Sequence, residues 1–186
     1  MNAVIAPPET KLITGEELLD MGDVGPCELI DGRIVPLAPT GGEHGLVEFN
    51  LGGELRSFVR QHQLGWVMGG EVGIYTRRNP DSVRGADVVF ISKERMPDRP
   101  KGFLEIAPDL VVEVISPNDR WQDIQQKIEE YFAIGVHWVW VVEPDNRAVR
   151  IYRSATDIHK LTEDDTLMGE GPLAGFALPV AEIFAE

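Results

Sequence analysis

The chain has 186 residues, 43% of them hydrophobic, so it is long enough for one domain with a buried core. Its single cysteine, Cys27, excludes an intramolecular disulfide and a multi-cysteine zinc site. The formal net charge of −14 disfavours DNA as a partner, because proteins that bind duplexes usually gather Lys and Arg at the phosphates. No apolar stretch reaches the roughly 18 residues of a membrane span, and no secretory signal pattern begins the chain. We therefore expect a cytoplasmic protein without membrane association.

The chain is expected to begin with a flexible arm over residues 1–12, followed by a single domain over residues 13–186. Thr14 and Glu17 have the spacing of a capping box. In such a box each of the two side chains accepts a hydrogen bond from the other residue's backbone N–H. This pair predicts a short helix that ends near Met21.

Three further elements are predicted before the middle of the chain. Asp31 and Gly32 predict a two-residue hairpin turn within residues 28–36, because both residues tolerate a positive φ. Apolar side chains recur at helical spacing over residues 43–61, which predicts a long amphipathic helix. The β-prone residues of 65–76 predict a strand.

The second half of the chain alternates between strands and helices. The predicted elements are a strand over 84–92, a buried strand between Pro108 and Pro117, a helix ending at Ile134 before Gly135, strands over 136–142 and 147–153, and, after residue 157, one weak strand and a short helix near 180–185. Asn118 or Asp119 is expected to cap the central helix. This order indicates an α/β or α+β domain with a mixed central sheet flanked by helices.

Two acids stand out because of their apolar surroundings. Glu113 is the only charged residue in the run 110–115, and a buried carboxylate requires a partner, a metal or a solvent-filled cleft. Asp87 precedes the apolar run 88–91; on composition alone, turn hydrogen bonds at a strand start are the simpler explanation for it. If the two strands are neighbours, the acids form an oxygen-rich pocket that suits Mg²⁺ or Mn²⁺. Such an ion can activate water and neutralise charge on a phosphate.

The position of a matching cation is less direct. A lysine two residues after Glu113 would share its strand face, but that residue is Ile115. Lys127 lies on the following helix, roughly 12 Å along its axis, and could reach back to the cleft. Asp123 and Tyr131 lie on the same helix face at i−4 and i+4. On sequence alone, an ion pair of Lys127 with Asp123 on a solvated face is the simpler interpretation.

The segment from Asp109 to Pro144, together with the Glu28–Gly32 motif, Pro39, His44 and the Gly85–Val88 motif, resembles the Uma-two family of restriction-endonuclease-like proteins. The resemblance covers about residues 28–185. It implies a restriction-endonuclease-like fold and a metal-dependent endonuclease site of the PD-(D/E)XK type, acting on DNA with one or two Mg²⁺ or Mn²⁺ ions. Asp87 and Glu113 match the two metal-binding acids, and Lys127 matches a lysine displaced onto the helix.

Further residues are expected to support these three. His44 matches a histidine of the family, although a histidine at this place could also make only local hydrogen bonds. Glu48, one turn further on, could add a carboxylate. Ser116 and Tyr131 are expected to orient the acids, and Asp123 shares the helix face of Lys127.

Two other functions stay open at this point. The charge of −14 favours a non-catalytic binding or regulatory module on the same fold, and a nuclease that is active only with a basic partner also fits. A homodimer is expected as well, because many enzymes that cut both strands pair two sites about a twofold axis. The tryptophan-containing strand 136–142 and the hairpin that follows it are the expected interface.

Overall fold

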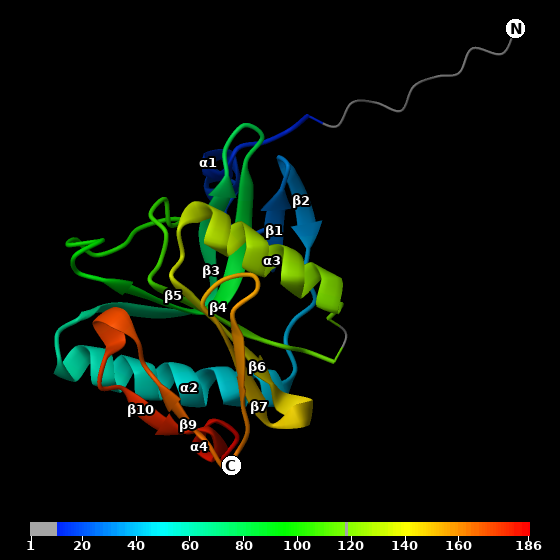
Figure 1. Ribbon diagram of the computed structural model, residues 1–186. Coiled ribbons are helices and arrows are strands. Elements are labelled where there is room, and N and C mark those ends of the chain that lie inside the picture. The colour runs from blue at the N-terminus through cyan, green and yellow to red at the C-terminus, as the bar shows by residue number, and fades with distance from the viewer. Residues whose placement is uncertain (1–10, 118) are drawn as a thin grey trace, which may run out of the picture.

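The computed structural model describes residues 11–117 and 119–186, so most of the expected N-terminal arm lies outside the described residues. The described chain forms one large mixed sheet with helices on both faces (Figure 1). The elements in chain order are α1 (Gly15–Asp20), β1 (Cys27–Ile30), β2 (Arg33–Pro36), α2 (Gly42–Gln61), β3 (Gly65–Arg77), β4 (Ser82–Ser92), β5 (Leu110–Val114), α3 (Trp121–Ile134), β6 (Trp138–Glu143), β7 (Ala148–Tyr152), β8 (Ile158–Leu161), β9 (Thr166–Met168), β10 (Ala177–Pro179) and α4 (Val180–Ile183), with 3-10 turns at Pro144–Asn146 and Gly171–Leu173.

The two N-terminal turns form as the sequence predicts. The Thr14 side chain accepts a hydrogen bond from the Glu17 N–H at 3.1 Å, and the Glu17 carboxylate accepts one from the Thr14 N–H at 2.9 Å. Asp31 and Gly32 have φ values of 52° and 71°, the left-handed conformations that a type I′ hairpin requires. The predicted capping box and hairpin are therefore confirmed.

The long helices also follow the predicted boundaries, with one correction. α2 differs from the predicted 43–61 by one residue, and α3 ends at Ile134, followed by Gly135 with a φ of 97°. The expected cap of α3 by Asp119 is wrong: its carboxylate instead accepts a hydrogen bond from the Ser116 N–H at 2.8 Å, and Arg120 precedes the helix. Asn118, the other expected cap, lies outside the described residues. Within the described chain, no helix combines the length and apolar character needed to cross a membrane.

The central strand β5 is buried on both faces, as its near-continuous apolar run predicts. Leu110, Val112 and Val114 belong to the core on the α2 side of the sheet. Val111, with the opposite side-chain direction, belongs to the core on the α3 side. Complete burial of a Val or Leu side chain stabilises a fold by roughly 1.5–3 kcal/mol, so these residues hold the sheet between α2 and α3.

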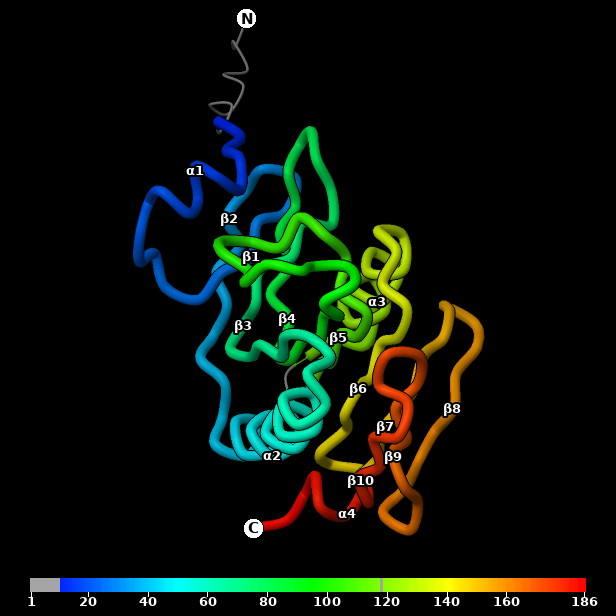
Figure 2. The backbone as a smooth tube through the Cα atoms, turned by 90° about the vertical axis from the view of Figure 1, so that its left-hand side faces the viewer, coloured from blue at the N-terminus to red at the C-terminus, as the bar shows by residue number. Residues whose placement is uncertain are grey.

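The C-terminal segment has more regular structure than the one weak strand predicted. It contains β8 at an edge of the large sheet and a separate two-stranded sheet of β9 and β10. Leu167 and Leu178 of the small sheet are buried in the α2-side core, as Figure 2 illustrates by the position of β9, β10 and α4 near α2. Strands of three or four residues carry too few alternations for a pattern to reveal them. The predicted terminal helix is confirmed as α4.

Strand β4 has one edge that is shared between two partners. β3 pairs with β4 over nearly its whole length. On the opposite edge β1 pairs at Val83, whereas β5 pairs only from Val88 to Phe90. Between them, residues 84–87 have no partner strand on that edge among the described strands. This split edge positions the candidate site.

Candidate functional site

The split edge exposes the backbone of Gly85 to side chains instead of to a strand. The Gly85 N–H donates a hydrogen bond to the Glu28 carboxylate at 3.1 Å, and the Gly85 carbonyl accepts one from Lys127 Nζ at 2.9 Å. Two residues further on, Asp87 Oδ2 accepts a hydrogen bond from the Val114 N–H at 2.6 Å. Both backbone polar groups of Gly85 are thereby satisfied, and Asp87 is tied to the backbone of β5 at the residue after Glu113.

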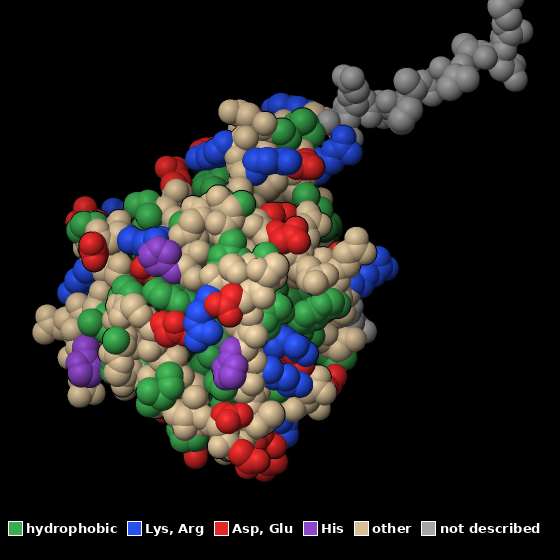
Figure 3. All heavy atoms as spheres, viewed as in Figure 1, with side chains coloured by type: hydrophobic (Ala, Val, Ile, Leu, Met, Phe, Trp, Pro, Cys, Tyr) green, Lys and Arg blue, Asp and Glu red, His purple; other side chains and the backbone are tan. Residues whose placement is uncertain are grey.

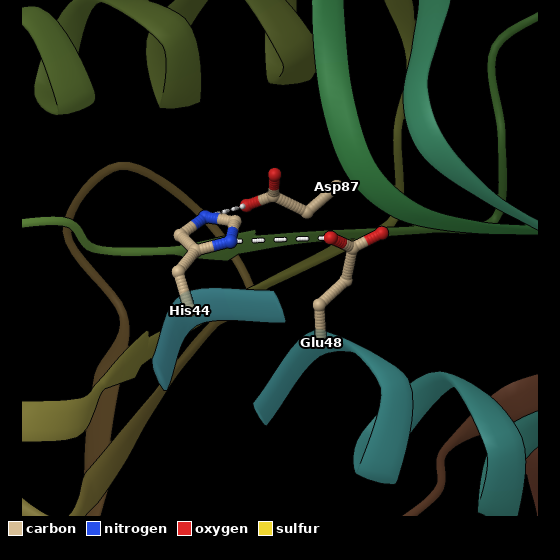
Figure 4. A group of neighbouring side chains, drawn as sticks. All are labelled: His44, Glu48 and Asp87. Atoms are coloured by element: carbon tan, nitrogen blue, oxygen red, sulfur yellow. Dashed lines mark ion pairs between the residues drawn. The ribbon is translucent and has the colours of Figure 1, made fainter. Parts of the chain in front are cut away.

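Asp87 meets two side chains from the first turns of α2 (Figure 4). His44 Nε2 lies 3.3 Å from Asp87 Oδ2, and His44 Nδ1 lies 3.9 Å from Glu48 Oε2. His44 and Glu48 face the same way because they are four residues apart on the helix. Each of the three residues offers a ligand atom, and these atoms all lie within 4.8 Å of one another.

One ring nitrogen of His44 lacks a partner. His44 Nδ1 is buried and has no hydrogen-bond partner among the described residues, since 3.9 Å is too long for a hydrogen bond to Glu48. A buried polar atom without a partner is costly, and such atoms are rare in folded proteins. An imidazole nitrogen with two carboxylates forms a mixed donor set that suits a divalent transition ion such as Mn²⁺. The residues present therefore fit a divalent cation.

The electrostatics of this cluster also favour a cation. Burial raises the pKa of Glu48, and the nearby Asp87 raises it further. The hydrogen bond to Asp87 raises the pKa of His44, although burial opposes this effect. Two carboxylates at short range repel each other, and a bound positive ion removes the repulsion.

Glu113 is held by α3. Tyr131 donates its hydroxyl to Glu113 Oε1 at 2.6 Å, and Lys127 Nζ donates to Oε2 at 3.0 Å. The pKa of Glu113 is raised to about 7, mainly by burial and also by the charge of Asp87, while Lys127 acts in the opposite direction. Burial lowers the pKa of Lys127, but the negative charges of Glu113 and Glu28 outweigh it, so this pKa lies above its ordinary value. Lys127 thus stays positively charged at neutral pH.

Glu28 belongs to the same network, which the sequence analysis did not predict. Its Oε1 lies 3.2 Å from Lys127 Nζ, and its Oε2 accepts a hydrogen bond from Arg84 at 2.9 Å. Arg84 in turn pairs with Glu130 of α3 at 2.6 Å. A signal was present, because Glu28 is a charged residue next to Leu29 and Ile30 in a short apolar strand, as Glu113 is in β5.

A second acid that the sequence did not predict for the site, Glu71, lies beside Gly85. β3 has an irregularity between Gly69 and Val72, where Glu71 adopts a φ of 59°. The Gly70 N–H donates to Glu48 Oε1 at 3.0 Å, which anchors the irregular segment to α2. The Glu71 carboxylate lies so close to Gly85 that a Cβ there would be 2.5 Å from Oε2. Burial, then the charge of Asp87, raises the pKa of Glu71.

The structure brings the predicted residues into two groups. Asp87 lies with His44 and Glu48, whereas Glu113 lies with Lys127 and Tyr131. The hydrogen bond from the Val114 N–H to Asp87 joins the two groups.

The remaining two predicted residues lie apart from these groups. Ser116 follows β5, and its backbone N–H bonds to Asp119. Asp123 is exposed and forms no ion pair with a described residue. The simpler interpretation that Lys127 pairs with Asp123 is wrong, because Lys127 turns inward to Glu113 and Glu28.

The described chain is thus an α+β domain with one large mixed sheet, helices on its two faces and acidic side chains at the split edge of β4. Residues 16–181 match the model of the Uma2 (Uma-two) family, described as "Putative restriction endonuclease", and the chain belongs to this family. The resemblance predicted from the sequence is confirmed.

A solved structure supports the fold. The crystal structure of a "putative nuclease" from Anabaena variabilis superposes with a TM-score of 0.77 and 20% sequence identity, over 92% of this chain and 97% of that chain. At this identity the likeness concerns the fold alone. None of the curated proteins matches the chain.

Proposed function

We propose that this protein is a metal-dependent endonuclease that hydrolyses phosphodiester bonds in DNA through a PD-(D/E)XK-type site with a displaced lysine. The observation that carries the proposal is the unpartnered nitrogen of His44, which lies among metal-ligand atoms next to the Glu113–Lys127 pair. Membership of a restriction-endonuclease-like family supports it.

The metal ion of this proposal is Mn²⁺ or Mg²⁺. Asp87 and Glu113 would hold it, as the sequence predicts, and His44 and Glu48 would complete the donor set. The bound ion would lower the pKa of a water molecule and neutralise charge on the phosphate. Because Mg²⁺ prefers oxygen donors alone, the imidazole nitrogen should give this site a higher affinity for Mn²⁺ than for Mg²⁺.

The protein residues contribute orientation and charge. Tyr131 and Lys127 each hold one oxygen of Glu113, and the Val114 N–H holds Asp87. These bonds place both carboxylates before a substrate arrives, which is the preorganisation that electrostatic catalysis needs. Lys127 supplies the positive charge that stabilises the negative charge growing on the phosphate in the transition state.

The acidic composition supports a second candidate, a binding or regulatory module without activity. The net charge is −14, and over the face shown in Figure 3 acidic and basic side chains are interspersed, without a continuous basic area. A nuclease that needs a basic partner protein also fits this surface. Titration with Mn²⁺ in a calorimeter separates the candidates: no heat, together with no retardation of DNA at low salt, favours the inactive module.

The proposed activity is tested with supercoiled plasmid DNA and purified protein in Mn²⁺ or Mg²⁺, with EDTA as the blank. We expect nicked or linear plasmid from the wild type and none from Glu113→Ala. Glu129→Ala, an exposed substitution on the same helix as Lys127, is the matched control and should cut normally. Equal cleavage by Glu113→Ala and the wild type would contradict the assignment.

We also propose that the protein is a homodimer, with the hairpin that follows β6 as part of the interface. Trp140 is 2% exposed and stacks on Phe176 in the core, and Trp138 is packed against the same core. Trp140 therefore serves packing, whereas Trp138 is partly exposed. Light scattering at increasing concentration tests the dimer, and a constant monomer mass would contradict it.

A further inference from the structure

A hollow of about 340 Å³ lies at the opposite end of α2 from His44 and Glu48. It is bordered by the last turns of α2, the start of β3 and the residue after β4. The residues that line it are Arg56, Val59, Arg60, Gln63, Gly65, Trp66, Val67 and Lys93. Three of these side chains are cationic and none is acidic, which is a local reversal of charge in a protein of net charge −14.

The three cations of this hollow lie together, without a carboxylate among the residues that line it. Arg56, Arg60 and Lys93 are exposed, and none forms an ion pair with a residue that the structure describes. Elsewhere the cationic side chains are mostly paired with carboxylates, as in Arg78, Arg84, Arg95, Arg147, Arg150 and Arg153. The acids next in sequence, Glu54 and Glu94, do not line the hollow.

The fold itself does not account for this grouping. Arg56 and Arg60 are four residues apart on one helix face, where like charges destabilise a helix. Arg60 lies in the last turn of α2 and interacts favourably with the helix dipole. Arg56 lies one turn before it, where the dipole has little effect, and Lys93 belongs to another segment. An anion in the hollow would relieve the repulsion among the three side chains.

The remaining polar lining suits the same kind of ligand. Trp66 is half-buried, and its Nε1–H donates to the Met96 carbonyl at 3.0 Å, so the ring is fixed at the wall of the hollow. Gln63 is exposed at the rim and adds an amide donor. Arginine forks and a side-chain amide are the groups that commonly bind phosphate oxygens in protein–DNA contacts.

The hollow and the candidate metal site lie along the same seam between α2 and β3. Glu48 bonds to Gly70 of β3 at one end of the seam, and the hollow lies where β3 begins at Gly65. From Glu48 to Arg60 is about 18 Å along the helix at 1.5 Å per residue. On duplex DNA, with about 3.4 Å between phosphates along the axis, this distance corresponds to about five base pairs.

We propose that this hollow binds a backbone phosphate of the DNA whose scissile phosphate occupies the metal site. The inference rests on the proposed function, and it explains how an acidic protein holds a polyanion: the cations are concentrated at one anchor point instead of spread over the surface. The hollow contributes to binding and position, and takes no part in the chemical step.

The test is a fluorescence-anisotropy titration of the full chain with a labelled DNA duplex in EDTA, so that no cleavage occurs. The variant carries Arg56→Gln, Arg60→Gln and Lys93→Gln, and the control carries Arg99→Gln, Lys101→Gln and Lys160→Gln, the same charge change at exposed positions outside the hollow. We expect the hollow variant to bind at least about tenfold more weakly and the salt-dependence slope to fall by about one, because the contact with one phosphate contributes about 0.9. Equal binding by the two variants would overturn the inference.

Two further arms identify the ligand and separate this inference from the proposed function. A mononucleotide that competes as well as the duplex, at equal phosphate concentration, would overturn the assignment to a DNA backbone. Hydrolysis of bis(p-nitrophenyl) phosphate with Mn²⁺ needs no distant anchor, so the hollow variant should keep the wild-type rate. No hydrolysis by the wild type would count against the proposed nuclease, while weakened duplex binding by the variant would still support the anchor. Far-UV circular dichroism checks that both variants are folded.

Discussion

The two halves of the candidate site differ in how completely their polar atoms are satisfied. In the α3 half, both oxygens of Glu113 accept hydrogen bonds, and Lys127 has three acceptors within 3.2 Å. In the α2 half, His44 Nδ1 has no hydrogen-bond partner within residues 11–117 and 119–186, and the Glu48 carboxylate lies 3.9 Å away. A satisfied network is rigid and holds its members in place, whereas an unsatisfied one has capacity for a ligand. The α3 half therefore positions charge, and the α2 half is where a cation would enter.

Asp87 joins the two halves, so its loss should have the largest effect. We expect Asp87→Asn to lower plasmid cleavage at least about 100-fold, because a metal contributes several kcal/mol to the transition state and each 1.36 kcal/mol is tenfold in rate. Mn²⁺ binding, measured by calorimetry, should weaken in parallel. Asp98→Asn, an exposed substitution, should leave both unchanged. Normal cleavage by Asp87→Asn would contradict the role of Asp87 as the residue that joins the two halves of the site.

Lys127→Met separates the halves, since it removes the charge of the α3 half alone. We expect kcat to fall roughly 100-fold, the usual cost of losing one donor to a developing charge. Mn²⁺ affinity should change much less, because of the four proposed ligands Lys127 contacts Glu113 and none of His44, Glu48 and Asp87. Lys101→Met serves as an exposed control. If the substitution abolished Mn²⁺ binding and left kcat unchanged, the two roles would be reversed.

The raised pKa of Glu113 predicts a pH-dependent stability in the absence of metal. Its pKa rises from 4.5 to about 7, mainly through burial. The associated stability is present below pH 4.5 and is lost as the pH rises through about 7, since the folded state binds the proton more tightly. The loss should amount to at most about 3 kcal/mol. Urea unfolding in EDTA at several pH values measures it.

Glu113→Gln provides the control for this stability effect, because the amide does not titrate. Its unfolding free energy should fall less steeply with pH than that of the wild type between pH 4.5 and about 7. Identical slopes for the two proteins would show that Glu113 does not titrate in this range.

The smallest effect is expected for Glu48, the carboxylate of the α2 half that lies furthest from Asp87 along the chain of contacts through His44. Glu48→Gln keeps the side-chain shape and its bond to the Gly70 N–H but removes the negative charge. We expect Mn²⁺ affinity to fall about 10- to 100-fold, the range for residues that support a metal site. Glu43→Gln, on the same helix and exposed, is the matched control. If both substitutions changed the affinity equally, Glu48 would act only through the general field of the protein.

Features carried by a few adjacent residues were predictable from the sequence. Asp31-Gly32 specified the hairpin through the positive φ of both residues, and Gly135 specified the end of α3. Glu113 was identifiable because a lone carboxylate in a buried strand requires a partner, and Tyr131 and Lys127 are now seen to provide it. Each of these cases depends on local chemistry.

Features that depend on distant segments were not predictable. Glu28 enters the site only because β1 and β5 share one edge of β4, a fact of sheet order that no local pattern contains. Glu71 is placed by an irregularity in β3, and the basic hollow joins Arg56 to Lys93 across separate elements. The sequence alone favoured a solvated ion pair between Lys127 and Asp123. Lys127 instead turns inward, because the sheet order places Glu113 and Glu28 beneath α3.

The central claim is that the α2 half of the site takes up a divalent cation beside Asp87. A crystal soaked in Mn²⁺ and measured near the manganese absorption edge tests this claim most directly, because anomalous scattering locates the ion without reference to activity. We predict an anomalous peak coordinated by a ring nitrogen of His44 and a carboxylate oxygen of Asp87, with Glu48 or Glu113 as a further ligand. No peak at this cluster at saturating Mn²⁺ would contradict the account.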